Sequence, residues 1–526
     1  MAAGAADEEE DRLSGLPDDV LHSILARLPF KHAVRTSALS RRWPRLWLHA
    51  LAASPVLDFT DPDFVRGHSR AQFVATVNRC LSARGAAPLR ALRVAFSPFG
   101  AFERDVVGWI SAALGSGATE VDVDLRAQGR RRSGGIEADA EDDGGGTFRR
   151  TEVELRGDLF CSPSSLSRLS LSRFSLRHVP PGAAGLAGLT SLSLSHVDVT
   201  DDALRDAVSG CPVLEFLSLR SCDLLSNVRI AGGRLRGLEV VRCQVRQLQV
   251  AAPALESFAF HGDLMYLRED DSKPLEFIGS KGNNVTPPPS EATPELRDAY
   301  LSHVDFSGED EVFDGFAYTE FLNKVAHAKI LTICSVALLH IEEERFFSMP
   351  TIDTPNLQEL QVLMGSLGDD DDTRFPDFFE LAAPPLLERL FIQVNIQLPA
   401  DCDGDSEEED TDMVPGHEIS LGRLTFIKVA NFRGTRRELR LLRFLVGMAP
   451  ALEQLVLVTP DPEAEQGGTT LRHDDQDKQQ LLQIVQEQLS EVRKARRDQA
   501  HVVVCRARDD GSRRPAHSKY YHHDRE

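Results

Sequence analysis

Residues 166–174 read LSRLSLSRF, and the same pattern returns at 189–197 as LTSLSLSHV and at 214–222 as LEFLSLRSC. Two further copies begin at Leu235 and Leu255, so that the five starts are separated by 23, 25, 21 and 20 residues. Each L-x-L pair predicts a short strand that points alternate side chains inward. A unit of this length cannot bury its own apolar face, and we therefore expect the units to stack.

This spacing of leucines resembles the leucine-rich repeat, which implies an α/β solenoid with a parallel sheet on its concave side. Looser copies begin at Leu89, Leu296, Leu357, Leu387, Leu424 and Leu452. Between strands the chain returns through helices or irregular turns; at 200–212, for example, Thr200 can cap a helix that Gly210 and Pro212 end.

The side chains between the inward leucines are expected on the concave face, where they would contact a bound protein. They are Ser170, Ser193, Ser218 and Glu239, and they do not identify that protein. Cys222 and Cys243 follow their strands at a position that the repeat uses structurally. A nucleophilic cysteine needs a nearby base and an electropositive setting, and the sequence indicates neither.

Residues 13–47 read LSGLPDDVLHSILARLPFKHAVRTSALSRRWPRLW, and their apolar spacing is helical. The first helix is expected to end at Pro29, the second to span 31–39, and the third to follow Ser40. Three helices in about forty residues bury little apolar surface by themselves. This N-terminal segment is therefore expected to need a partner.

The same residues resemble an F-box, the unit that docks on the Skp adaptor of the Skp–cullin–F-box ubiquitin ligase. The resemblance covers residues 12–50, and an ordinary helical cap on the first repeat is the alternative. It implies the following adaptor-binding residues: Leu16, Pro17, Leu21, Ile24, Leu25, Leu28, Pro29, Val34, Leu39, Ser40, Trp43 and Trp47.

Residues 424–460 predict a strand, a loop, an amphipathic helix and a second strand. Thr435 and Glu438 fit a capping box, and Leu439, Leu442, Leu445 and Val446 form the expected buried stripe. The segment resembles the FBD domain of plant F-box proteins, especially at Asn431-Phe432-Arg433-Gly434. A helix at 479–497 and a strand at 501–505 are expected to close the end of the solenoid.

The net charge of −22 is concentrated in four acidic runs, at 7–11, 139–143, 369–372 and 401–412. The rest of the chain is close to neutral, which gives little support for nucleic acid as a partner. The eight cysteines form no close pair, no cofactor or metal motif is visible, and no apolar run is long enough to cross a membrane. We expect a soluble protein of the cytoplasm, the nucleus or both.

These observations predict an acidic disordered tail at 1–11, an F-box at 12–52, an irregular repeat solenoid at 53–414, an FBD-like domain at 415–506 and a disordered tail at 507–526. The expected function is that of a non-catalytic substrate-recognition subunit, which binds the Skp-type adaptor and through it a cullin. The alternatives are a small-molecule receptor of the same plan and a scaffold outside a ligase. Histidines and acidic runs lack catalytic or metal-site spacing, so an enzyme is not expected.

Overall fold

The computed structural model describes residues 16–25, 54–61, 65, 69–84, 87–96, 102–125, 153–262, 275–277, 292–303, 321–334, 352–364, 378–379, 382, 384–394, 419–460, 474–496 and 500–517. The chain divides into two compact units, Met1–Arg234 and Leu235–Glu526. The expected F-box helices at 31–39 and after Ser40 lie outside the described residues.

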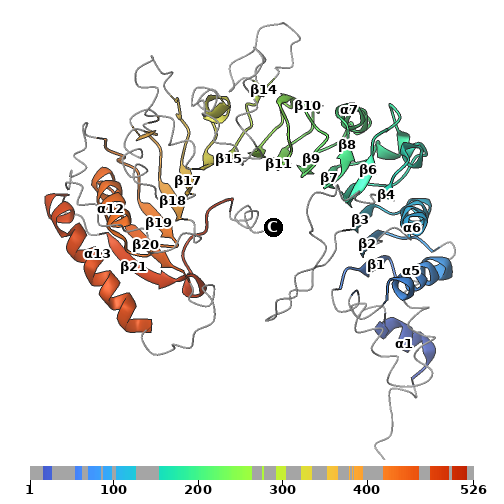
Figure 1. Cartoon of the computed structure of the whole chain (residues 1–526), viewed down its shortest axis with the longest axis horizontal. Coiled ribbons are helices and arrows are strands. Elements are labelled where there is room, and N and C mark those ends of the chain that lie inside the picture. The colour runs from blue at the N-terminus through green and yellow to red at the C-terminus, as the bar shows by residue number, and fades with distance from the viewer. Residues whose placement is uncertain are drawn as a thin grey trace, which may run out of the picture. The chain divides into compact units, whose positions relative to one another are not determined.

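Unit 1 is built on a parallel sheet in which strand order follows chain order (Figure 1). Its strands are β1 (Val56–Phe59), β2 (Ala91–Ala95), β3 (Glu120–Asp124), β5 (Arg168–Ser172), β7 (Ser191–Ser195) and β9 (Phe216–Arg220). The repeated leucines are in register, with Leu171 opposite Leu194 and Leu194 opposite Leu219. All three are buried, so the predicted stacking of L-x-L strands is confirmed.

A second layer of short strands lies beyond the core of unit 1. Strands β4 (Val153–Glu154), β6 (Phe174–Leu176) and β8 (Asp198–Val199) form a three-stranded sheet. Phe174 and Val197, which occupy the same position after their L-x-L strands, are buried. The apolar position after each strand therefore joins the main sheet to this layer.

Helices fill the return path of several repeats in unit 1. They are α5 (Arg70–Arg84), α6 (Glu103–Gly115) and α7 (Asp201–Ser209). The buried indole of Trp109 on α6 donates to Asn78 of α5 over 2.6 Å and thereby fixes the two helices against each other. Helix α7 starts as predicted, since Thr200 accepts from the backbone of Ala203, and Gly210 is its C-cap.

Unit 2 continues the same plan with a parallel sheet, again in chain order. Its strands are β11 (Gly237–Val241), β13 (Ser257–Gly262), β15 (Asp298–His303), β16 (Ile330–Cys334), β17 (Glu359–Met364), β18 (Arg389–Val394), β19 (Phe426–Ala430), β20 (Gln454–Thr459) and β21 (His501–Arg506). β12 (Gln247–Ala251) pairs with β14 (Leu275–Phe277). The predicted α/β fold with a large parallel sheet is therefore confirmed.

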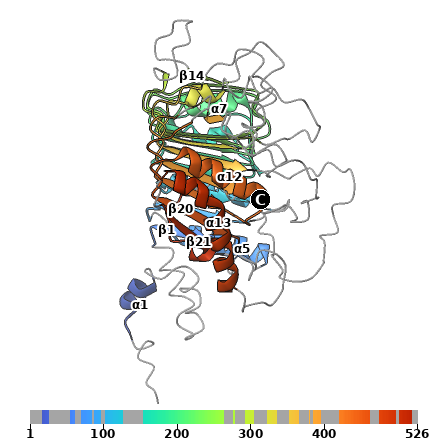
Figure 2. The same cartoon turned by 90° about the vertical axis from the view of Figure 1, so that its left-hand side faces the viewer.

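Two helices cover the end of this sheet, α12 (Arg436–Met448) and α13 (Asp474–Arg496), and they lie side by side over β20 and β21 (Figures 1 and 2). The predicted capping box is present: Thr435 accepts from the Glu438 backbone and Glu438 accepts from the Thr435 backbone. Leu442, Leu445 and Val446 are buried as expected, whereas Leu439 is only half-buried.

The motif Asn431-Phe432-Arg433-Gly434 shapes the turn between β19 and α12. Asn431 has a φ of 63° and donates its side-chain amide to the carbonyl of Val394 over 2.6 Å. Phe432 is fully buried, and Gly434 has a φ of 80° close to Leu481 of α13. Asn431, Phe432 and Gly434 therefore each contribute to the fold of unit 2.

The C-terminal residues differ from the expectation of a disordered tail starting at residue 507. Residues 507–517 are described and turn back from β21 onto the sheet of unit 2, where Lys428 pairs with Asp510 and His517 is buried (Figure 1). These polar contacts replace the apolar pattern by which order is usually recognised in a sequence. Within the described residues, no helix is long and apolar enough to span a membrane.

Candidate functional site

Helix α1 (Asp18–Leu25) is the described part of the N-terminal segment. The carbonyl of Pro17 accepts hydrogen bonds from the backbones of Val20 and Leu21, both at 3.1 Å, and so begins the helix. Asp18 and Asp19 lie in the first turn, where the helix dipole favours negative charge. The sequence pattern therefore gives the helix start that was predicted for it.

The apolar residues of α1 fall into two groups. Leu21 and Leu25 are fully buried within the chain, whereas Val20 and Ile24 expose 43% and 37% of their surface. Residues four positions apart lie on the same side of a helix. Val20 and Ile24 thus form one exposed aliphatic patch, which we call the α1 patch.

Three of the expected adaptor-binding residues lie on this helix. Ile24 is exposed, whereas Leu21 and Leu25 are buried within the chain. Val20, which shares the exposed side of the helix with Ile24, was not among the expected residues. Of the remaining expected residues, Leu16 is half-buried and Pro17 exposed, and these lie outside the described residues: Leu28, Pro29, Val34, Leu39, Ser40, Trp43 and Trp47.

The second candidate surface is the front face, by which we mean the side of each sheet that carries the residues between the inward leucines. In unit 1, Ser170, Ser193 and Ser218 occupy one row of this face, since each is in register with the next. The row continues to Asp122, which is paired in register with Ser170. The predicted alignment of these small polar side chains is therefore confirmed.

The front face of unit 1 also carries charge and one exposed ring. Arg93 lies 3.8 Å from Asp58 and 3.2 Å from Glu120. Burial raises the pKa of the Asp122 carboxyl above its usual range, although a hydrogen bond from Ser170 opposes the shift. Phe216 exposes 49% of its surface at the start of β9. A large exposed ring beside small polar groups is typical of a protein-binding surface.

The front face of unit 2 has a different composition. Its central row runs from Glu239 through Tyr300, Thr332 and Gln361 to Lys428, as the strand register shows. The half-buried Glu239 was expected on this face. The C-terminal residues 510–517 contact the part of the row that lies on β15 to β19.

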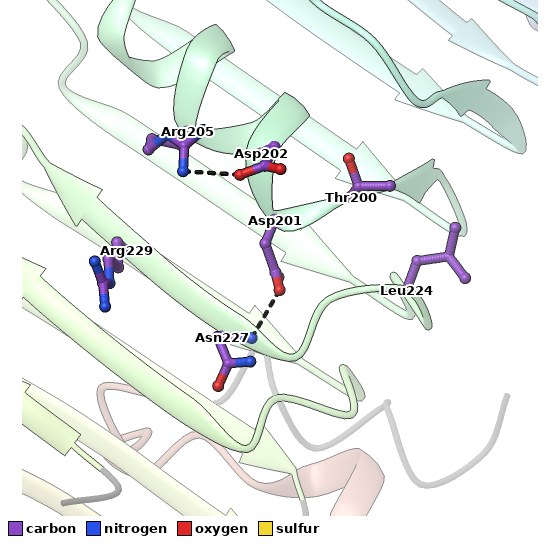
Figure 3. Close-up of a pocket in the computed structure, with 7 residues that line it drawn as sticks. All are labelled: Thr200, Asp201, Asp202, Arg205, Leu224, Asn227 and Arg229. Carbon is purple, nitrogen blue, oxygen red and sulfur yellow. Dashed lines mark hydrogen bonds and ion pairs between the residues drawn. The ribbon is translucent and has the colours of Figure 1, made fainter. Parts of the chain in front are cut away.

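Figure 3 shows a pocket of about 360 Å³ at the start of α7. It is lined by Thr200, Asp201, Asp202, Arg205, Leu224, Asn227 and Arg229. The carboxylate of Asp201 accepts from the backbones of Ser226 and Asn227, both at 2.9 Å, and thus holds α7 to β10 (Asn227–Ala231). Asp202 pairs with Arg205 at 2.8 Å. These acids serve the local fold.

The cysteines of the repeats have structural surroundings. Cys222 is buried and its thiol donates to the carbonyl of Leu194 over 3.7 Å. Burial raises the pKa of the Cys80 thiol to about 11 and that of Cys211 to about 12, so both remain protonated at neutral pH. Among the described residues, no group of three His, Cys, Asp or Glu side chains could hold a metal ion.

Comparison with known proteins finds two family models in this chain. The F-box domain matches residues 13–50, and the LRR repeats of the FBD-associated F-box protein At5g56370 match residues 147–281. The first match includes the α1 patch, and the second includes the L-x-L strands from β5 to β13.

Similar proteins come from Arabidopsis thaliana. The F-box protein At5g03100 is 29% identical over 249 residues, which cover 46% of this chain and 67% of the relative. The FBD-associated F-box protein At5g38590 is 25% identical, with coverage of 67% and 78%. F-box/LRR-repeat protein 13 is 24% identical, with coverage of 88% and 93%.

The fold and these matches give the chain an F-box region followed by leucine-rich repeats. More narrowly, the chain combines its parts as the plant F-box/LRR-repeat and FBD-associated F-box proteins do, which confirms the resemblance drawn from the sequence. The bounds 415–506 for an FBD-like domain stay a prediction.

Proposed function

We propose that this chain is a substrate-recognition subunit of a Skp–cullin–F-box ubiquitin ligase. The F-box binds the Skp-type adaptor, which links the chain to a cullin, and the repeats bind a protein target. As part of the same proposal, the chain acts in the cytoplasm, the nucleus or both.

The observation that carries the proposal is the α1 patch within the F-box match. Val20 and Ile24 keep large exposed aliphatic surfaces side by side, although Leu21 and Leu25 of the same helix are buried. Covering such a patch with a partner stabilises the complex by about 25 cal/mol per Å² of apolar surface removed from water. An adaptor groove with apolar side chains suits it.

The role of the repeats follows from the front face of unit 1. The serine row is short and polar, and the ring of Phe216 projects from the edge of the same face. Aromatic side chains are enriched among the residues that dominate protein interfaces. A subunit built in this way needs no bond chemistry of its own, because holding a target near a ubiquitin-charged enzyme raises the effective concentration of that target.

The test separates the two ends of the chain. Tagged wild type, a Leu28→Ala/Pro29→Ala/Trp43→Ala variant and a Phe216→Ala variant are expressed under proteasome inhibition with a proximity-labelling enzyme attached. We expect the triple variant to lose adaptor and cullin, and Phe216→Ala to keep both while losing labelled targets. Adaptor recovery that is equal for wild type and the triple variant, or absent from both, would remove the ligase proposal. Adaptor without cullin would indicate a scaffold outside a ligase.

A further inference from the structure

The C-terminal segment 510–517 makes specific contacts with the front face of unit 2. At one end, the Lys428 ammonium lies 2.5 Å from the Asp510 carboxylate and donates to the carbonyl of Arg513 over 3.2 Å. At the other end, the backbone of Ala516 donates to Glu359 over 2.8 Å. The segment therefore bridges from β19 to β17.

His517 anchors the far end. One ring nitrogen hydrogen-bonds with Thr332 at 2.7 Å, and the other lies 2.9 Å from the carboxylate of Asp298. The ring of Tyr300 meets the imidazole edge-on, with centroids 5.8 Å apart. Side chains from β15 and β16 thus form a seat for one imidazole.

The rest of the segment is largely exposed. Among residues 507–517 only His517 is buried, and Gly511, Arg513, Arg514 and Ala516 are exposed. Contacts of this kind give specificity through hydrogen bonds and charge, and they remove little apolar surface from water. The segment therefore contacts the sheet through a few polar groups, as a bound peptide does, and adds little to the hydrophobic core.

The front face also carries a hydrogen-bond donor that the segment does not contact. Gln361 is 1% exposed and lies in the same row as Thr332 and Lys428. One end of its amide hydrogen-bonds with Thr332 at 3.0 Å, while the nitrogen has no hydrogen-bond partner among the described residues. Leaving a buried amide group unsatisfied costs about 1–3 kcal/mol. The Gln361 nitrogen is therefore a hydrogen-bond donor that another occupant of this face can satisfy.

We propose that the front face of β15 to β19 is a peptide-binding site for the target, and that residues 510–517 are an intramolecular competitor which occupies it. This inference rests on the proposed function, according to which the repeats bind a protein target. The charges define the ligand: an extended segment with an acidic side chain for Lys428 and, seven residues toward its C-terminus, a histidine for Asp298 and Thr332. A carbonyl or amide group between them can reach Gln361.

The first test uses the full chain and a fluorescein-labelled peptide of residues 508–519. An Asp510→Asn/His517→Ala variant should release its own segment, and Arg514→Ala is the matched control, because Arg514 is an exposed residue of the same segment. We expect the double variant to bind the peptide at least tenfold more tightly than wild type or Arg514→Ala. Adding Lys428→Ala to the double variant should weaken that binding at least tenfold. Equal affinity across all variants, or no binding by any, overturns the proposal.

The second test needs no variant. Hydrogen exchange of the wild-type chain should replace the amide proton of Ala516 at least a hundredfold faster than those of β17 and β18, because the segment opens while the sheet stays folded. Equal protection means that the segment is part of the folded core and overturns the proposal, whatever the peptide does. Adaptor binding is measured on the same variants: if it is absent while the peptide binds, the ligase assignment fails and the peptide site stands.

Discussion

Replacing Gly434 by alanine is expected to destabilise unit 2, although the change adds only one methyl group. Gly434 has a φ of 80°, and an added Cβ would lie 2.5 Å from Cδ1 of Leu481 on α13. A side chain in this left-handed region costs about 1–2 kcal/mol. Moving the leucine from its preferred rotamer costs about 0.5–1.5 kcal/mol.

The unfolded chain offsets part of this cost, since alanine there has less conformational freedom than glycine, by about 0.4–1 kcal/mol. The net loss is about 2 kcal/mol, which corresponds to a fall in melting temperature of about 3 °C for a unit of this size. Gly447 provides the matched control. It lies in α12, and nothing lies within 4 Å of an added Cβ.

Gly447→Ala should therefore stabilise the helix by about 0.5–1 kcal/mol, as alanine does in helix interiors. Scanning calorimetry of wild type and both variants gives the melting temperatures directly. The two glycine substitutions should therefore change the melting temperature in opposite directions. A Gly434→Ala protein that melts at or above the wild-type temperature would refute the packing of α13 on this turn.

Three further predictions concern single groups. Glu438→Ala removes the buried acceptor of the capping box and should lower the free energy of unfolding by about 1–2 kcal/mol in chemical denaturation. Glu438→Gln keeps an acceptor oxygen and should lower it clearly less. Equal losses from the two variants would contradict the cap. In thiol labelling at pH 8, the exposed Cys161 should react while Cys211, with a pKa raised by burial to about 12, should not until unfolding. Burial alone would raise the pKa of Asp510, but hydrogen bonds from Lys428 and Ser512 hold it below its usual range. The stability contributed by that ionised carboxylate is present above the unfolded pKa of about 3.9 and is lost as pH falls through the lower folded pKa. Exchange protection at Ala516 should accordingly decline as the pH falls below about 4, and protection that is undiminished at pH 2 would contradict the pairing.

The periodic parts of the fold were predictable from the sequence because the spacing of leucines in each repeat indicates which side chains are buried. Leu169, Leu192 and Leu217 are all buried at the expected position, and the Thr435–Glu438 capping box lies where its spacing indicated. Local patterns of this kind carry their information within a few residues.

The left-handed turns after the strands were not predictable in the same way. Arg173, His196 and Ser221 follow β5, β7 and β9 with φ values of 63°, 53° and 48°. These residue types seldom mark such a conformation, for which glycine or asparagine is the usual signal. Here the stacking of the repeats imposes the left-handed conformation on residues that do not favour it.

The docking of the C-terminal segment also left no local signal. Asp510 meets Lys428 from 82 residues away, and His517 meets Asp298 from 219 residues away. Isolated polar residues in a charged tail read as solvated, since nothing in their neighbourhood identifies their partners. The sequence pattern thus predicted the α1 helix and the serine row of unit 1. It did not predict that the C-terminal segment occupies the front face of unit 2.

The proposed function requires the α1 patch to be a partner-binding surface. Its direct test is the affinity of a purified Skp-type adaptor for wild type, a Val20→Ala/Ile24→Ala variant and an Asp19→Ala control, measured by titration calorimetry together with melting temperatures. Each aliphatic carbon group that the adaptor covers contributes about 0.8 kcal/mol, and the two truncations remove several of them. The double variant should therefore bind more than tenfold more weakly at an unchanged melting temperature, while Asp19→Ala binds as wild type does. Undiminished binding by the double variant, or no binding by wild type, would contradict the central claim.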